Sequence, residues 1–570
     1  MAFANDMEVF AHAIGYKSSN DMFMKVMFPV LIGSVVFAVA LNFIFTVPVF
    51  LPLIILFLGF LVAVAIPFIK FNVLKADIQN NIHYMITYAG TLSTMDISHY
   101  ILFRRLSEKS FYGYISTIFS QIHYLSKKWN IDYPSACKHL AKRTPSKILR
   151  DFLDRVAIAI SFGEDLKIFL EGEQKAVMED YSIEYQKSLE SIKMVQEFFM
   201  ALTIAFAFTI SVLLFATLMM DINVVSTLVW AFVGLFLIDG GLLAIVLSIV
   251  PRDSLFNSPS LQNENQKILS NKLLLSIIAS IIIFTSLFLI TSLSGLVVFG
   301  IAILPLFYVA REAKREENRV HIRDNQFPSF IRSLGAAIEV RGGAVRSAIQ
   351  QVKVHDFGPL NGLLEHLYRR WTIAEDKFSA WTYFARESGS KLISNFTKIF
   401  SESINLGGNG TKVGELISNN IIHQLSLRKL RKQQAGSLKG TVYGLFFGIV
   451  ITIFISVEIS RFLIDTFSAN EAGTATLDFV QSIFPSISSI NFDLVFTIVS
   501  IMLVFHALAS SLIIKITEGG SMYTALTDFI VLVWIIAVLS LLVPQMVGSI
   551  LPESASIANA SAANVTSVGI

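Results

Sequence analysis

The chain has 570 residues, of which 54% are hydrophobic and only 15% are charged, and its formal net charge is +3. This composition is too apolar for a soluble globular protein and indicates an integral membrane protein. The single cysteine, Cys137, excludes an internal disulfide framework and a zinc site built from several thiolates. The first 26 residues lack the basic and then apolar layout of a cleaved signal peptide, so we expect this segment to be retained.

Nine apolar stretches are long enough to cross a membrane, since a helical span needs about 20 apolar residues. They alternate with two polar blocks, residues 70–197 and 311–440, whose apolar residues recur at helical spacing. We therefore predict an all-α fold, namely a polytopic membrane protein with about nine transmembrane helices and two cytoplasmic helical-bundle domains. The predicted spans are 27–46, 49–69, 198–219, 225–249, 273–292, 294–310, 441–463, 494–514 and 525–547.

The basic residues predict the orientation in the membrane. Of the 45 Lys and Arg residues, 38 lie in the two polar blocks, which the positive-inside rule places in the cytoplasm together with the N-terminus. The C-terminal tail has no Lys or Arg, holds glycosylation sequons at Asn559 and Asn564, and is predicted to be exterior. The predicted divisions are a cytoplasmic N-terminus (1–26), a transmembrane hairpin (27–69), a first cytoplasmic domain (70–197), a transmembrane pair (198–249), a cytoplasmic loop (250–272), a second hairpin (273–310), a second cytoplasmic domain (311–440), three transmembrane helices (441–547) and an exterior tail (548–570).

The two polar blocks are similar to each other. AKRTPSKILRDFLDRVAIAISFGEDLKIFLE, which starts at Ala141, aligns with ARESGSKLISNFTKIFSESINLGGNGTKVGELI, which starts at Ala385. Upstream, Asp77 opens the first block as Asp324 opens the second, so the blocks are predicted to arise by internal duplication. Each block also has an apolar stripe on its entry helix, made by Ile78, Ile82, Met85, Ile86 and Ala89 in the first and by Phe327, Phe330, Ile331, Leu334 and Ile338 in the second.

The cluster GGNGTK at residues 407–412 has two readings, a phosphate-binding loop or a turn between helices. A P-loop needs a strand, the order G-x-x-x-x-G-K-[ST] and then a helix, whereas here a helix precedes the cluster and Thr and Lys come in reverse order. The equivalent turn in the first block has one glycine followed by two acids, which would repel phosphate. We therefore predict structural turn glycines at Gly163, Gly407 and Gly408.

Five short motifs are shared with a known family. They are residues 143–147 (RTPSK), 150–154 (RDFLD), 357–360 (FGPL), 388–391 (SGSK) and 407–409 (GGN). Through these motifs both blocks resemble the membrane platform proteins of type IV pilus and type II secretion machines, the type II secretion system F-domain superfamily. The two-copy form is similar to archaeal members, which serve archaella and adhesion pili.

The resemblance implies a scaffold of the cytoplasmic membrane that has no enzymatic activity, cofactor or metal. Such platforms dock a hexameric secretion ATPase on their cytoplasmic domains and pass its motion to pilin or archaellin subunits, in cell motility or protein secretion. It further implies contact with other membrane components of the machine, a homodimer, and no nucleic acid. The alternative from another class is a secondary transporter with two repeated halves. A membrane-embedded protease is the weakest reading, because no catalytic or metal-binding residue set is present.

Basic residues in the blocks are the docking candidates, since charged surfaces orient an acidic partner. The competing interpretation is that topology alone makes cytoplasmic segments basic. The candidates are Lys142, Arg143, Lys147, Arg150 and Arg155 in the first block and Arg341, Arg346, Lys391 and Lys412 in the second.

Other charged segments have structural interpretations. The alternating charges of 311–319 predict a solvated helix, and the basic run 428–432 predicts contact with anionic lipid headgroups. Ionisable residues within spans are functional candidates by default. These are Asp239, an ion pair of Glu458 with Arg461, and His506, which we expect to form an interhelical hydrogen bond.

Overall fold

The computed structural model describes residues 11, 16, 18–35, 50–95, 97–108, 112–219, 224–251, 253–257, 264–291, 293–373, 377–469 and 491–550. These residues form helices joined by turns, with no strand among them, so the all-α prediction is confirmed. The chain divides into two compact units. The first unit comprises Met1–Lys187, Pro251–Leu261 and Val320–Leu427, and the second comprises Ser188–Val250, Gln262–Arg319 and Arg428–Ile570.

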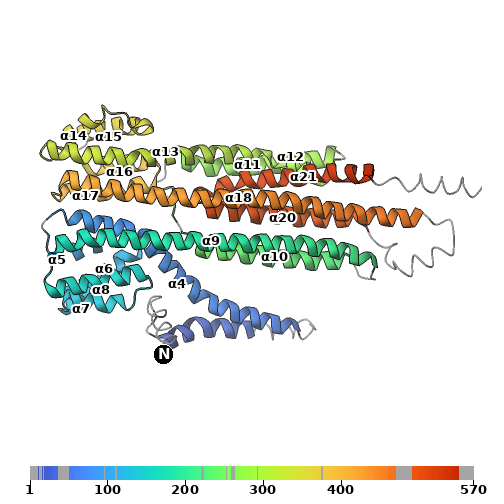
Figure 1. Cartoon of the computed structure of the whole chain (residues 1–570), viewed down its shortest axis with the longest axis horizontal. Coiled ribbons are helices and arrows are strands. Elements are labelled where there is room, and N and C mark those ends of the chain that lie inside the picture. The colour runs from blue at the N-terminus through green and yellow to red at the C-terminus, as the bar shows by residue number, and fades with distance from the viewer. Residues whose placement is uncertain are drawn as a thin grey trace, which may run out of the picture. The chain divides into compact units, whose positions relative to one another are not determined.

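Two copies of one helix order make up most of the first unit (Figure 1). In each copy the end of a long helix is followed by four shorter α-helices and by the start of a second long helix, as internal duplication predicts, and the second copy adds one short 3-10 helix, η4. The first copy runs through α4 (Phe50–Leu92), α5 (His99–Ser107), α6 (Tyr114–Trp129), α7 (Tyr133–Ala141), α8 (Lys147–Phe162) and α9 (Leu166–Met219). The second runs through α13 (Leu304–Val340), α14 (Val345–Val352), the short η4 (Gly358–Leu360), α15 (Asn361–Ile373), α16 (Lys377–Ser388), α17 (Lys391–Asn405) and α18 (Gly410–Ala469).

Local side-chain caps explain where several of these helices begin. The Ser98 hydroxyl accepts a hydrogen bond from the Ile101 amide at the start of α5, and the Ser390 hydroxyl accepts one from Ile393 at the start of α17. Asp132 caps α7 in the same way, with a proline in the first turn of that helix. Such residues satisfy backbone N–H groups that have no partner within the helix.

The two copies share one buried interior within the first unit. Both predicted apolar stripes, on α4 and on α13, are buried. Where α4 meets α17, the Tyr88 hydroxyl donates to the Glu402 carboxylate over 2.7 Å, and the Ser403 hydroxyl donates to Thr91 over 2.7 Å. The burial of Tyr88 and its contact with Glu402 raise the pKa of this phenol. The repeated blocks therefore pack against each other through both apolar and polar contacts.

The second unit contains the apolar segments of seven helices. Seven helices in the described part of the chain are long and apolar enough to cross a membrane, and they coincide with the last seven predicted spans. The first two predicted spans, 27–46 and 49–69, lie partly outside the described residues and stay predictions, as does the exterior tail with Asn559 and Asn564. The remaining elements of the described residues are the short α2 (Ser19–Met22) and π-helix η1 (Phe23–Met27) of the first unit, and α10 (Val224–Ile249), α11 (Glu264–Ile290), α12 (Gly295–Ala302), α20 (Phe492–Glu518), η6 (Met522–Thr524) and α21 (Ala525–Ile550) of the second.

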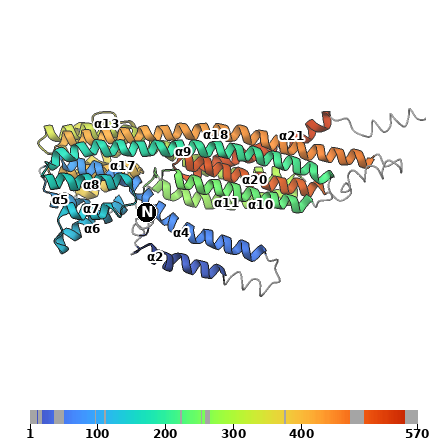
Figure 2. The same cartoon turned by 60° about the horizontal axis from the view of Figure 1, so that its bottom comes forward.

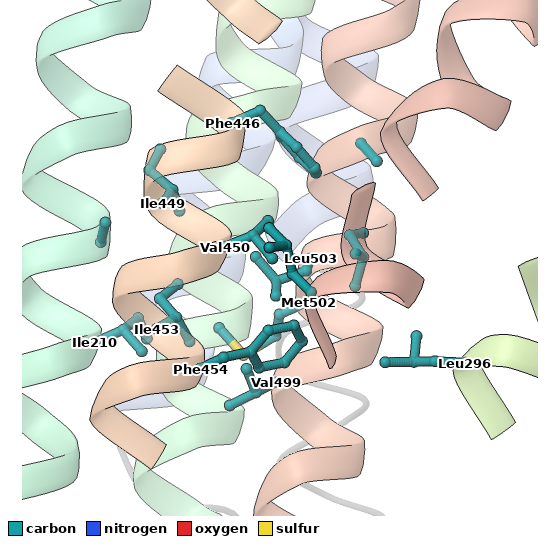
Figure 3. Packing of buried hydrophobic residues seen from close by; sticks show 14 of the residues in the cluster. Ile210, Leu296, Phe446, Ile449, Val450, Ile453, Phe454, Val499, Met502 and Leu503 are labelled. Carbon is teal, nitrogen blue, oxygen red and sulfur yellow. The ribbon is translucent and has the colours of Figure 1, made fainter. Parts of the chain in front are cut away.

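The centre of the second unit is an apolar cluster around α18 and α20 (Figure 3). Val450 and Phe454 of α18 lie beside Met502 and Leu503 of α20, and Phe446 of α18 belongs to the same cluster. Helices α10 and α20 pack along their lengths and lie side by side (Figure 2). This packing holds the polar residues of α10 and α20 at the positions described below.

Candidate functional site

The GGNGTK segment is a turn between two helices. Helix α17 ends at Asn405, Gly407 follows with a φ of +88°, and α18 begins at Gly410. The Gly408 amide donates to the Ser403 carbonyl over 2.9 Å, which closes the end of α17. Positive φ favours glycine because a Cβ is strained there, so Gly407 has a backbone role.

A protein carboxylate lies where a phosphate would bind in a P-loop. The amide of Gly410, the first residue of α18, donates to Glu339 Oε2 over 2.8 Å, and the Asn409 side-chain amide donates to Glu339 Oε1 over 3.1 Å. The first amides of a helix attract an anion, and here Glu339 of α13 supplies one. The geometry thus supports the turn reading and leaves the N-terminus of α18 without a free anion site.

Glycines also bring α13 and α18 into backbone contact. A Cβ added at Gly335 would lie 2.3 Å from the Gly410 carbonyl oxygen, and one added at Gly414 would lie 2.9 Å from the Ile331 carbonyl oxygen. No side chain fits at these crossings without moving a helix. The four-residue spacing of Gly410 and Gly414, which puts both on one helix face, was the available sequence signal and was missed.

The equivalent turn of the first copy has the same backbone form. Gly163 follows α8 with a φ of +67°, and the Glu164 amide donates to the Ala159 carbonyl over 3.0 Å. Phe162, immediately before this glycine, is 85% exposed. The duplicated bundle therefore uses a left-handed glycine after the fourth short helix of each copy.

Only some of the first copy's basic candidates are free to meet a partner. Lys142, Arg143 and Lys147 are exposed. Arg150 donates to the Thr144 carbonyl over 3.1 Å, and Arg155 forms an ion pair of 2.7 Å with the buried Glu173. The structure therefore gives Arg150 and Arg155 partners inside the unit, whereas the other three face solvent.

The second copy's basic candidates lie on four different elements. Arg341 follows α13 and donates to Gln351 over 3.3 Å, while Arg346 is exposed on α14. Lys391 is half-buried at the start of α17, and Lys412 is exposed in the first turn of α18. Docking by any of these residues stays a prediction.

Asp239 and His506 form one buried site in the second unit. His506 Nδ1 lies 2.9 Å from Asp239 Oδ2 and 3.1 Å from Oδ1, and the two side chains are only 3% and 1% exposed. The imidazole stacks between the rings of Phe199 and Phe446, each with its centroid 5.8 Å away. Helices α9, α10, α18 and α20 thus meet at one histidine, which makes the predicted interhelical hydrogen bond.

The duplication could have revealed this pairing. Asp239 and His506 lie at almost the same distance from the starts of α10 and α20, which follow the long helices α9 and α18 of the two copies. Phe199 and Phe446 occupy similar positions on those long helices. The site therefore joins equivalent residues of the two halves of the chain.

The other predicted intramembrane pair stays a prediction. Glu458 is half-buried and Arg461 is exposed on α18.

In the described part of the chain, no group of three or more His, Cys, Asp and Glu side chains is placed to hold a metal ion.

The expectation of a solvated helix at 311–319 was wrong on one face. Glu317 is 3% exposed and contacts the fully buried Lys515 ammonium of α20 at 3.1 Å. Lys515 also contacts Glu518 at 3.2 Å, and Lys314 contacts Glu518 at 3.0 Å. The alternating charges of 311–319 gave no sign of this cluster. Its other members, Lys515 and Glu518, lie about 200 residues further along the chain than Lys314 and Glu317.

One member of the basic run 428–432 is also internal. Arg431 is 5% exposed and donates to the carbonyls of Thr517 and Ile516, both over 2.8 Å, at the end of α20. A Cβ at Gly519, whose φ is +81°, would lie 2.9 Å from the Arg431 guanidinium carbon. Arg431 therefore caps α20 and does not reach lipid headgroups, which corrects the prediction for this residue.

Comparison with known proteins identifies relatives along nearly the whole chain. The family described as Type II secretion system (T2SS), protein F, matches residues 85–214. Flagella accessory protein J of Methanocaldococcus jannaschii is 30% identical over 550 residues, which cover 94% of this chain and 96% of that protein. Flagella accessory protein J of Methanococcus voltae is 30% identical over 546 residues, which cover 93% of this chain and 97% of that protein. No solved structure matches the chain. The chain therefore belongs to the type II secretion system protein F family, as a two-copy member similar to flagella accessory protein J.

Proposed function

We propose that this protein is the membrane platform of a type IV pilus-like filament, an archaellum or an adhesion pilus. In this proposal it docks a hexameric secretion ATPase and couples its motion to the assembly of filament subunits. The observation that carries the proposal is the 30% identity to flagella accessory protein J, because it extends over 94% of this chain and so includes both units. A role in a flagellar machine is what the names of both long relatives state.

The first unit is the part that we assign to the ATPase. Its helices carry most of the basic residues, and a basic surface attracts and orients an acidic partner. We place the N-terminus and both polar blocks in the cytoplasm on the positive-inside rule. The spans of the second unit would then contact filament subunits and other membrane components, and a homodimer would present two platforms to one hexamer.

We assign no reaction to the chain itself. The GGNGTK turn is filled by Glu339, and this arrangement favours a scaffold over a nucleotide-binding enzyme. The transporter alternative has no support from the relatives, which are flagella accessory proteins.

Deleting the gene and purifying the whole chain test this function together. We expect the deletion strain to lack filaments in electron micrographs, and complementation to restore them. We also expect the full-length protein in nanodiscs to bind the secretion ATPase of the same cell. Normal filaments in the deletion strain and no ATPase binding would contradict the proposal, and solute uptake by proteoliposomes would favour a transporter.

A further inference from the structure

One face of the first copy is basic without any acidic residue on its helices. Helix α6 has the sequence YISTIFSQIHYLSKKW and α7 has YPSACKHLA, and neither contains Asp or Glu. We call this face the α6–α7 surface and define it by five exposed cations. They are Lys127, Lys128, Lys138, Lys142 and Arg143.

A groove lies within this surface. Its volume is about 340 Å³, and its apolar lining includes Leu125 and Leu140. Tyr124, which is 56% exposed, and Arg143 also line it. Trp129, at the end of α6 and next to the two lysines, is 68% exposed. Aromatic rings and arginine beside an apolar depression are the side chains that dominate binding energy at protein interfaces.

The equivalent helices of the second copy, α15 and α16, carry two acids, and both form ion pairs with nearby cations. Glu365 of α15 contacts Lys353 at 2.9 Å and Arg369 at 3.0 Å. Glu387 of α16 pairs with Arg370 of α15. The second copy therefore has the same helix order with ion pairs at this place. Packing of the bundle does not require the unpaired cations that the first copy has on α6 and α7.

Membrane topology does not account for this difference either. The positive-inside rule depends on the number of Lys and Arg residues, and acidic residues have little influence on it. Topology can explain why both copies are rich in cations, but it gives no reason why α6 and α7 themselves contain no acid, the nearest one along the chain being the exposed Asp132 that caps α7. Concentrated charge of one sign steers an oppositely charged partner and raises its association rate.

We propose that the α6–α7 surface binds an acidic segment of a partner protein, which inserts an apolar side chain into the groove beside Tyr124. The inference rests on the proposed function, in which this partner is the secretion ATPase. The groove favours a protein over a lipid surface, because a headgroup layer requires only charge whereas an apolar depression takes up a side chain. The first copy is thus the docking copy, and the corresponding face of the second copy, where Glu365 and Glu387 form ion pairs, has another role.

The test measures ATPase binding to the full-length protein in nanodiscs of neutral lipid. The variant K127Q/K128Q/K138Q removes three cations from the surface. The matched control K167Q/K175Q/K193Q removes three exposed lysines from α9. We expect the first variant to lose at least about tenfold in affinity, mainly through a slower and less salt-dependent association, and the control to stay within about twofold.

A second variant separates the groove from the charge. Tyr124→Ala keeps every cation, and since Tyr124 is exposed, the bundle should tolerate it. We expect faster dissociation of the ATPase and little change in its association rate. Failure of the wild-type protein to bind would overturn the proposed function and this inference with it. Binding that is equal for wild type, the surface variant and the control would overturn only this inference. If the surface variant lost binding relative to wild type solely in nanodiscs that contain anionic lipid, the α6–α7 surface would be a lipid-binding surface. That result would also overturn this inference.

Discussion

Asp239 of α10 and His506 of α20 lie 2.9 Å apart in the buried centre of the second unit, at equivalent positions of the two duplicated halves. The histidine ring between Phe199 and Phe446 extends this relationship to the long helices of both copies. A buried polar pair contributes less net stability than an apolar pair of the same size, but breaking it is costly. The pair therefore specifies how the two halves meet more than how strongly they adhere.

Exchange of the two residues tests this pairing. Each single variant, D239H or H506D, leaves two like groups facing each other and should cost about 3–5 kcal/mol of stability. The double exchange D239H/H506D rebuilds the pair in the opposite sense, and we expect it to recover most of that loss. Thermal unfolding of the purified protein measures the three variants. Thr209→Val, which changes an exposed side chain of α9, serves as the control. A double variant as unstable as the sum of the singles would show that the pairing does not matter.

The buried ammonium of Lys515 gives a second prediction. Replacing it by methionine leaves Glu317 buried with a weaker partner, Lys314 at 3.6 Å, and should cost about 3–5 kcal/mol. The double variant K515M/E317Q removes both charges and should recover part of this loss. Arg311→Met, an exposed change on the same helix as Glu317, should stay within about 0.5 kcal/mol. Equal unfolding temperatures for K515M and R311M would disprove the assigned role of the cluster.

Helical periodicity predicted much of the fold but few of these contacts. The stripes that begin at Ile78 and Phe327 are buried because periodicity places them on one helix face, and duplication made the order of elements visible twice. The pairing of Lys515 with Glu317 depends on which helices become neighbours, and local periodicity does not contain that information. Glu339 was missed for the same reason, because it fills the turn at Gly410 from another helix.

The close crossing of α13 and α18 predicts that alanine is harmful at Gly335, which lies at the crossing, but not at Gly436, which lies away from it. Gly335→Ala places a methyl group 2.3 Å from the Gly410 carbonyl oxygen and should destabilise the protein by about 1–3 kcal/mol. Gly436 also lies within a helix, α18, but nothing lies within 4 Å of an added Cβ. Gly436→Ala should therefore be neutral or stabilise by up to about 1 kcal/mol. Denaturant or thermal unfolding of both variants checks the sign, and a stable Gly335→Ala protein would mean that the helices do not cross closely.

The turn reading of GGNGTK predicts that this segment acts through the backbone. Gly407→Ala forces a methyl-bearing residue to a φ of +88° and should cost about 1–2 kcal/mol. Lys412→Ala removes an exposed side chain and should leave stability nearly unchanged. Neither variant should alter nucleotide binding, which we expect to be absent from the purified chain and which a fluorescent ATP analogue measures. Hydrolysis of ATP by the chain alone, stopped by Lys412→Ala, would restore the phosphate-loop reading.

Cys137 provides a chemical report on the first bundle. Burial raises the pKa of its thiol, and the nearby carboxylates of Asp154 and Asp132 raise it further. Because the reactive species is the thiolate, a raised pKa lowers its fraction at any given pH and slows reaction with disulfide or maleimide reagents. We expect almost no labelling of the folded protein at pH 8 and rapid labelling once the bundle unfolds in denaturant. Since this is the only cysteine in the sequence, the labelled fraction reports unfolding of this bundle directly.

Gly163→Ala, which strains the turn after α8 at a φ of +67°, should shift the labelling transition to lower denaturant, whereas Gly436→Ala should not. Fast labelling of the native wild-type protein would contradict the burial of Cys137 between α7 and its neighbours.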